Sequence, residues 1–315
     1  MNNDRVFIVG LPRTGSTLLR TILNKSERVS ICAETHFLSR WSRIGRKRQI
    51  SRFGDLRVDR NAEAFVDAIF SPRYASLKDF WGWLNNNVDR QAFKNRLLET
   101  DCSDRAIFDL FMQFYAEKRK GPIQPDWILG EKTSANIYFV PTLFEWFPNT
   151  KIIHTFRDPR GIFVSAAKLV RNGKWGVRKM LPSLPERLLN PIMDSIMASY
   201  VTRAWLDAVR LHSRYERQYP DKYLLVRFED LIRDPEGQIR RACSFLDVAF
   251  DPSLVAEVAI VGSSYTAQRI VPGGFDPTAG ERWKDHINPL AGAWFSMLGK
   301  KHLKRFGYLT DGYSR

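Results

Sequence analysis

Two short stretches near the start of the chain contain residues whose types and spacing suit anion chemistry. The first is "GLPRTGST", residues 10–17, which fits the G-x-x-x-x-G pattern of a phosphate-binding loop. The backbone N–H groups of such a loop, with the N-terminus of the following helix, bind phosphate oxygens. The second is "ICAETHFLSR", in which Glu34 and His36 are two candidate general bases.

The loop lacks the cation of nucleotide hydrolases. Lysine follows the second glycine in those proteins, whereas Ser16 stands there in this chain. Without that lysine the contact to the β- and γ-phosphates is lost, which argues against nucleotide hydrolysis. Arg13 lies in the crown of the loop instead, and its planar guanidinium suits two-point binding of an oxyanion. A strand-turn-helix with two chance glycines is the alternative interpretation.

The elements that must position these residues alternate along the chain. Apolar segments rich in β-branched residues predict buried parallel strands at 6–10, 127–131, 151–156 and 222–228, with a weaker one at 28–32. Helical patterns occupy 17–25, 62–70, 105–119, 159–171, 195–218 and 236–246. This alternation predicts an α/β three-layer sandwich with a central parallel sheet. Ligands of such sheets lie beyond the carboxyl ends of the strands, and the distinctive residues follow those ends.

The length and the net charge of the chain indicate how many domains it has and what kind of ligand it binds. The 315 residues are 44% hydrophobic, which predicts one large domain, with a largely helical acceptor-side insertion at about 39–125. The net charge of +15 favours an anionic ligand, acceptor or surface. Residues 39–60 contain eight basic residues, which predict an exposed loop or lid, or else a solvated surface.

The cysteine, histidine and hydropathy patterns argue against a disulfide-stabilised, a metal-binding or a membrane-spanning protein. Three distant cysteines and five scattered histidines indicate neither a disulfide framework nor a metal site. No apolar run approaches the roughly 20 residues needed to span a bilayer, so we expect a cytoplasmic protein, with peripheral membrane contact as an open possibility.

The loop resembles that of sulfotransferases that use 3′-phosphoadenosine 5′-phosphosulfate (PAPS), and "PRTGST" looks like the tyrosylprotein and bacterial carbohydrate branches. This resemblance implies a P-loop-kinase-like sulfotransferase fold. It also implies that Arg13 stabilises the bridging oxygen, while the 5′-phosphate is held by Thr14, Gly15, Ser16 and Thr17.

A second motif, "FRDPRGIFVS", follows the strand at 151–156, and Asp158 with Pro159 suits a helix start. In the family, an arginine and a serine eight residues later bind the 3′-phosphate of the cofactor. The resemblance therefore assigns that role to Arg157 and Ser165, and Arg160 is expected to face solvent or a carboxylate.

Two further stretches are similar to family motifs. "LLVRFEDLIRDPEGQIRRACSFLDV" has Phe228 where the family usually has tyrosine, which leaves stacking against adenine as its implied role. "GERWKDHI" resembles a closing loop over the cofactor, and this implies contacts to the 3′-phosphate and adenine from Arg282, Trp283 and Lys284.

The resemblance also favours one base. In the tyrosylprotein branch a glutamate 21 residues after the loop arginine is the base, and Glu34 stands at that distance from Arg13. Lys132 matches a family lysine that assists at the sulfate. His36 occupies the place of a substrate-binding arginine, which argues against the same acidic peptide acceptor. A surface ion pair for Glu34, a structural role for His36 and a snorkelling lysine at 132 are the alternatives.

The resemblance, carried by these residues, implies transfer of a sulfuryl group from PAPS to a hydroxyl of a carbohydrate or small-molecule acceptor, by in-line displacement without a metal. A P-loop kinase or nucleotide hydrolase is the first alternative, with Glu229 and Asp230 as a magnesium-binding pair. A basic nucleic-acid-binding protein is the second, but only residues 39–60 approach the required basic and aromatic pattern.

Overall fold

A single parallel sheet forms the centre of the computed structural model, which describes residues 4–38, 50–171, 186–256 and 275–309. The sheet has five strands in the order β2-β3-β1-β4-β5. Their bounds are β1 (Arg5–Gly10), β2 (Val29–Cys32), β3 (Ile128–Lys132), β4 (Lys151–Phe156) and β5 (Tyr223–Arg227). The five predicted strands are therefore confirmed. Several strand ends differ from the prediction by one residue, and Phe228, predicted to end the last strand, instead begins helix α11 (Phe228–Arg233).

Side chains of β1 alternate between two separate cores, as the pleat requires. Val6 and Ile8 pack with apolar residues of α1 (Ser16–Leu23), α12 (Pro235–Leu246) and α13 (Ser253–Ala256) on one face of the sheet. Phe7 and Val9 belong to the larger core on the other face. That core includes residues of α7 (Asp104–Lys120), α8 (Val140–Trp146), α9 (Pro159–Arg171) and α10 (Glu186–Gln218). The predicted three-layer sandwich is confirmed.

Several helices lie outside the predicted set. The predicted helices at 62–70 and 195–218 begin earlier, as α3 (Asp59–Ile69) and α10. Shorter or more weakly patterned helices were missed, namely α4 (Pro72–Ala75), α5 (Phe80–Asn87), α6 (Arg90–Leu98), α8, α11, α13 and α14 (Pro289–Arg305). Three 3₁₀ turns complete the described elements: η1 (Ser51–Phe53), η2 (Ser134–Phe139) and η4 (Pro277–Gly280). No helix within the described ranges combines the length and apolar character needed to cross a bilayer.

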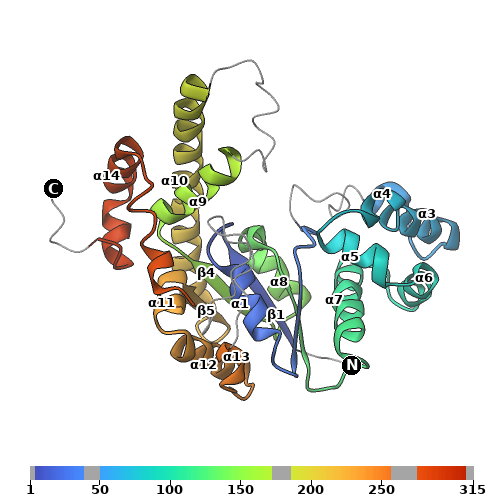
Figure 1. Cartoon of the computed structure of the whole chain (residues 1–315). Helices are drawn as coiled ribbons and strands as arrows, with labels where there is room; N and C mark the ends of the chain where they lie inside the picture. The colour runs from blue at the N-terminus through green and yellow to red at the C-terminus, as the bar shows by residue number, and fades with distance from the viewer. Residues whose placement is uncertain (1–3, 39–49, 172–185, 257–274, 310–315) are drawn as a thin grey trace.

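The helices and 3₁₀ turns described between β2 and β3 are η1 and α3 to α7, and no strand is described there. In Figure 1 these helices lie to the right of the sheet and α9, α10 and α14 to its left, while α7, α9 and α10 all contribute to the larger core on one face. Residues 39–49 of the predicted basic loop lie outside the described residues, and 50–60 contain η1 and the start of α3. The acceptor-side role of this helical segment stays a prediction.

Candidate active site

The loop at 10–17 joins β1 to α1 and has the backbone of an anion cradle. Gly10 and Gly15 adopt φ values of 144° and 86°, and a Cβ on Gly15 would stand 2.6 Å from Cδ2 of Phe228. Helix α1 has no side-chain cap at its N-terminus and no acidic residue in its first turn. Its leading N–H groups therefore suit an oxyanion, since neither a side-chain cap nor an acidic residue competes for them.

The loop hydroxyls differ in what they contact. Thr14 is buried, and its Oγ1 donates to the carbonyl of Leu11 at 2.7 Å and lies 2.8 Å from Oγ1 of Thr155. Ser16 Oγ lies 3.5 Å from Oγ of Ser134, the first residue of η2. The Thr14 hydroxyl thus stabilises the loop itself. The Ser16 hydroxyl lies at the start of α1, next to the hydroxyl of Ser134 in the segment that follows β3.

Arg13 links two motifs that are far apart in sequence. Its backbone has a left-handed φ of 74°, which is uncommon for a residue with a side chain. Its Nε donates to Oγ of Ser165 on α9 at 2.8 Å. Burial lowers the pKa of Arg13, while the charge of Glu34 opposes that shift. The guanidinium therefore lies within electrostatic range of the candidate base and in direct contact with the predicted 3′-phosphate serine.

Arg157 fastens the loop from the other side. Its Nη1 donates to the Arg13 carbonyl at 3.0 Å, and its Nη2 donates to the Ala279 carbonyl at 3.2 Å. The same guanidinium stands 4.1 Å from the ring centroid of Phe228. Phe228 consequently contacts both Gly15 and Arg157, so its ring forms part of the loop's support.

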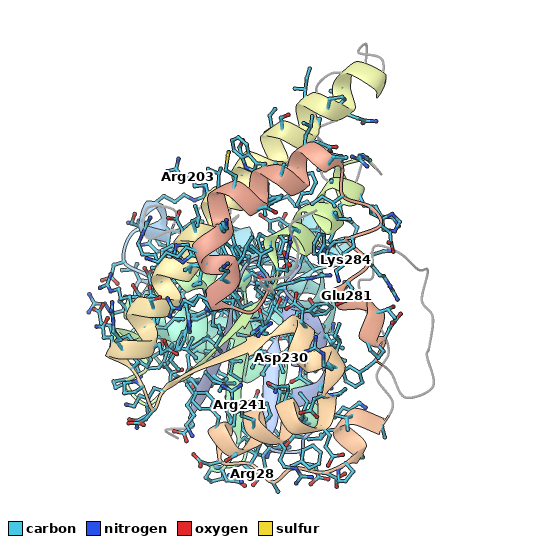
Figure 2. All side chains as sticks on the ribbon, turned by 90° about the vertical axis from the view of Figure 1, so that its left-hand side faces the viewer. Arg28, Arg203, Asp230, Arg241, Glu281 and Lys284 are labelled. Carbon is cyan, nitrogen blue, oxygen red and sulfur yellow. The ribbon has the colours of Figure 1, made fainter. Side chains whose placement is uncertain are left out.

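The closing-loop residues are already engaged with neighbours. Arg282 pairs with Asp276, and Lys284 Nζ lies 3.1 Å from Oε2 of Glu281; Figure 2 shows this second pair at the surface. The Trp283 ring lies under the guanidinium of Arg160, 4.0 Å from its centroid. Only the Ala279 carbonyl ties this segment directly to Arg157 in the contacts above.

Arg160 was predicted to face solvent or a carboxylate, and the first option is wrong. It is buried and pairs with Asp158, with Nη2 and Oδ2 2.7 Å apart. Nη2 also donates to the carbonyl of Tyr308 at 2.6 Å. The charge is satisfied internally, which is the condition for burying a guanidinium.

Glu34 lies beside two of the predicted partners. Its Oε1 accepts from Lys132 Nζ at 2.7 Å, and its Oε2 lies 3.7 Å from His36 Nε2. Burial alone would raise the pKa of Glu34, but the charges of Lys132, His36 and Arg20 outweigh burial and lower it. The carboxylate is therefore ionised at neutral pH and able to accept a proton. Glu34, Lys132 and Arg13 follow or end three neighbouring strands, as the sheet-edge argument predicted.

Sequence reasoning missed the group that holds this base in place. Glu131, one residue before Lys132, is fully buried and accepts from the backbone N–H of Thr35 at 2.9 Å and from Thr35 Oγ1 at 3.0 Å. The hydroxyl of Thr133 donates to the same oxygen. Thr35 stands between Glu34 and His36, and the latter has a left-handed φ of 54°. Glu131 thus fixes a strained turn that presents the candidate base.

Arg20 is a second residue that the sequence did not single out. It lies on α1, one turn after Ser16, and its buried Nε has no hydrogen-bond partner among the described residues. Its charge lowers the pKa of Glu34. The spacing of four residues from the loop was the available signal, because side chains at i and i+4 share one face of a helix.

The pair proposed for magnesium in the alternative interpretation is used in packing. Glu229 is buried and accepts from the Asp158 backbone N–H and from the Tyr308 hydroxyl, both at 3.1 Å. Burial raises its pKa, so the charged form required by a metal is disfavoured. Asp230 lies 3.6 Å from Nε of Arg227. These contacts argue against a magnesium-dependent nucleotide site.

Comparison with known proteins decides the family. Residues 5–252 match the model of the family described as the sulfotransferase family. The chain belongs to the sulfotransferase family. The family predicted from the four motifs is therefore confirmed.

Curated relatives of this sulfotransferase-family chain include one protein from Mycobacterium and one from Caenorhabditis. The omega-hydroxy-beta-dihydromenaquinone-9 sulfotransferase of Mycobacterium bovis is 26% identical over 262 residues, which cover 75% of this chain and 61% of the relative. The chain thus spans less than two thirds of that relative's length. A putative protein-tyrosine sulfotransferase of Caenorhabditis briggsae is 22% identical over 261 residues, covering 82% of this chain and 70% of the relative.

Solved structures match the fold. The sulfotransferase domain of the Synechococcus olefin synthase superposes with a TM-score of 0.57 at 20% identity, covering 98% of this chain and 96% of that domain. The sulfotransferase domain from the curacin biosynthetic pathway gives 0.52 at 17% identity, with coverage of 94% and 98%. The predicted sulfotransferase fold is confirmed by these superpositions.

Proposed function

We propose that this chain transfers a sulfuryl group from PAPS to the hydroxyl of an acceptor, with Glu34 as the general base. The observation that carries the proposal is the hydrogen bond between Arg13 and Ser165, 2.8 Å long across 152 residues of sequence. It brings the predicted 5′-phosphosulfate loop and the predicted 3′-phosphate motif to one place. A nucleotide phosphorylated at both the 3′ and 5′ positions needs two such anion sites next to each other.

The residues present suit this donor. The uncapped N-terminus of α1, the left-handed Gly15 and the Ser16 hydroxyl form a cradle for the 5′-phosphate. Ser165 and Arg157 supply a hydroxyl and a guanidinium for the 3′-phosphate, and Phe228 supplies an aromatic ring next to Arg157. Arg282, Trp283 and Lys284 are proposed as outer contacts. They would exchange their present partners for the nucleotide.

The donor supplies an activated sulfuryl group, whose sulfur bonds to the acceptor oxygen as its bond to the 5′-phosphate oxygen breaks. Glu34 takes the proton of the acceptor hydroxyl, and its ion pair with Lys132 keeps it ionised for that step. Arg13 and Lys132 offset the negative charge that builds on the departing phosphate oxygen. His36 is proposed to orient Glu34 through its Nε2, 3.7 Å away.

The donor assignment is tested by comparing 3′,5′-bisphosphoadenosine (PAP) with ATP and Mg²⁺ in calorimetric titrations of the whole chain. We expect PAP to bind and ATP to bind far more weakly. Mass spectrometry of an acceptor library incubated with PAPS then detects the added sulfate. Preference for ATP, or transfer that depends on Mg²⁺, would reverse the choice between sulfotransferase and nucleotide kinase.

The base assignment is tested with a matched pair of variants. Glu34→Gln should lower kcat by about 10²–10⁴-fold while PAP affinity is kept, because a single general base contributes that much. Glu27→Gln removes the same charge from an exposed residue before β2, and it should leave kcat unchanged. Retained activity in Glu34→Gln would move the base role to another residue.

The acceptor was predicted to be a carbohydrate or a small molecule. The relatives' names point to different hydroxyls, a menaquinone derivative in one case and a protein tyrosine in the other. We propose only a hydroxylated acceptor on this basis. The class of acceptor depends on the lining of the cavity next to Arg13.

A further inference from the structure

Two neighbouring cavities lie between helices α9 and α10, the first of them beside Arg13, and together they are called the groove here. Its first part, a cavity of about 20 Å³, lies against Pro12 and Arg13 of the loop. Ile162 and Ala166 of α9 and Met197 of α10 form its apolar walls. Because Arg13 is the proposed sulfuryl-side residue, this cavity adjoins the place where an acceptor hydroxyl would react.

The second cavity, of about 120 Å³, shares Met197 with the first. Ala167 and Val170 of α9 face Met193 and Leu189 of α10 there. From Ile162 to Val170 the two cavities extend along α9 for about 12 Å, at the usual rise per residue of a helix. Between Arg13 at one end and Arg171, Asn190 and Asp194 at the other, the lining is therefore apolar over a length of several carbon–carbon bonds.

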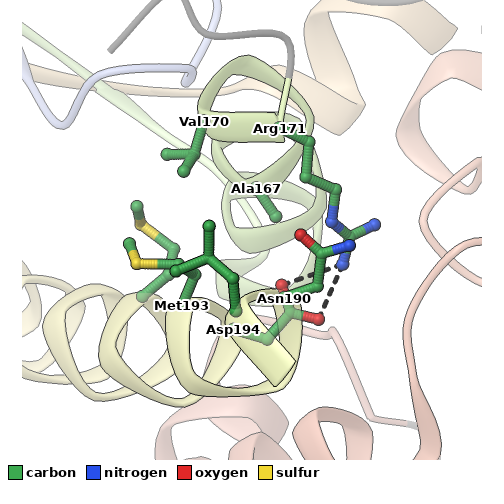
Figure 3. A pocket seen from close by; sticks show the side chains of 8 residues that line it. Ala167, Val170, Arg171, Asn190, Met193 and Asp194 are labelled. Carbon is green, nitrogen blue, oxygen red and sulfur yellow. Dashed lines mark hydrogen bonds and ion pairs between the residues drawn. The ribbon is translucent and has the colours of Figure 1, made fainter. Parts of the chain in front are cut away.

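Charged groups occur at the far rim of the second cavity, where they satisfy each other. Figure 3 shows Arg171 reaching toward Asp194 across that rim, and its Nη2 lies 2.6 Å from Oδ2. Asn288 also donates to Asp194 Oδ2, at 3.1 Å. Arg171 and Asp194 bind each other, and Asn190 also lines this rim. Polar partners are therefore concentrated at this end, and the wall between them and Arg13 lacks the distributed hydrogen-bond partners that a sugar requires.

The outer face of α10 extends this apolar surface. Tyr200 lines the first cavity and is 60% exposed, and it shares one helix face with Ile196 and Ile192, which are 56% and 52% exposed. Residues spaced by four form a continuous stripe. Contiguous exposed apolar surface beside a reactive site is typical of a ligand-binding groove.

We propose that the acceptor hydroxyl is carried at the end of an apolar chain or ring system, which lies in the groove between α9 and α10. This inference rests on the proposed sulfotransferase function. It favours the small-molecule alternative of the sequence prediction over the carbohydrate. The methionines at 193 and 197 suit such a ligand, because their flexible side chains adapt to irregular apolar shapes.

The inference predicts a dependence on chain length. With PAPS as donor, kcat/KM for linear primary alcohols should rise about three- to fourfold per methylene until the groove is filled, following the free energy of burying a CH₂ group. Hexoses and disaccharides, measured as controls, should be poor acceptors. PAP release monitors every acceptor in the same assay.

A matched pair of methionine variants locates the binding site. Met193→Gln places an amide in the half-buried wall of the groove and should raise KM at least several-fold for long alcohols, with little change for short ones. Met297→Gln makes the same change on α14, where Met297 is 69% exposed, and should alter neither. PAP affinity and melting temperature should stay at wild-type values in both variants.

The outcomes separate the inference from the function on which it rests. Efficient sulfation of sugars without dependence on chain length, or equal effects of the two methionine variants, would overturn the apolar acceptor and leave the sulfotransferase intact. Failure to bind PAP would refute the proposed function itself. Binding of PAP without turnover of any alcohol, together with no thermal stabilisation of the PAP complex by long alcohols, would also overturn the inference.

Discussion

Replacing Glu131 tests the idea that a buried carboxylate fixes the turn carrying the base. Oε1 of Glu131 accepts two hydrogen bonds from Thr35 and one from Thr133, and Oε2 accepts from Asn136 Nδ2 at 2.9 Å. Burial raises the pKa of Glu131 from 4.5 to about 7. The folded protein therefore holds this proton more tightly than the unfolded chain does.

The size and sign of the effect follow from that shift. Below about pH 4.5 the group is protonated in both states, and above about pH 7 it is ionised in both. Between these values only the unfolded chain releases the proton, so the free energy of unfolding falls as pH rises. A shift of 2.5 units, the difference between 7 and 4.5, corresponds to about 3 kcal/mol.

Glu131→Gln removes the titration and keeps the shape. The amide oxygen can still accept from Thr35, and the amide nitrogen can donate to Asn136 Oδ1, a buried atom without a hydrogen-bond partner in the described residues, once the Asn136 amide turns over. Urea unfolding of both proteins at about pH 5 and about pH 8 measures the difference. We expect the variant to gain about 2.5 kcal/mol relative to wild type between these two pH values, since a small part of the shift has developed by pH 5.

A stability difference that is the same at both pH values would refute this reasoning, because another group would then carry the pH dependence. Glu131→Ala provides the structural contrast. It leaves buried donors of Thr35 and Asn136 without an acceptor, which should lower the free energy of unfolding by about 3–5 kcal/mol. It should also lower kcat more than Glu131→Gln does, since the turn that presents Glu34 loses its anchor.

Three further results are expected. Lys132→Gln should move the acid limb of the kcat/KM profile to higher pH, because burial then raises the pKa of Glu34 against weaker opposition; an unmoved limb would separate the two residues. Arg13→Ala should lower kcat by about 10²–10³-fold with a smaller loss of PAP affinity, and a pure affinity loss would contradict transition-state stabilisation. Ser165→Ala should weaken PAP binding more than adenosine 5′-phosphate binding and also lower kcat, because it removes the acceptor of Arg13 Nε; equal weakening of both nucleotides would argue against a 3′-phosphate site.

Local signals made most of the sheet and the loop predictable. Each strand of the sheet is short and largely apolar, and a polar residue stands within three positions of its carboxyl end, so a few neighbouring residues are enough to locate it. The loop between β1 and α1 is equally local, because glycine spacing and a following amphipathic helix define it. Helices such as α6 escaped because their apolar residues lack a strong period, and α6 is held by packing of Phe93 and Leu97 into the core.

Within the candidate site, residue types were readable and their partners were not. The sequence by itself placed Arg13, Glu34, Lys132 and Arg157 at the carboxyl ends of strands, which is sufficient to bring them to one edge. Only the tertiary structure revealed the hydrogen bond from Arg13 to Ser165 and the buried ion pair of Arg160 with Asp158. It also revealed that Glu131 is fully buried. Hydrogen bonds and pKa values depend on distances between residues far apart in the chain and on burial, and neither quantity is encoded by local spacing.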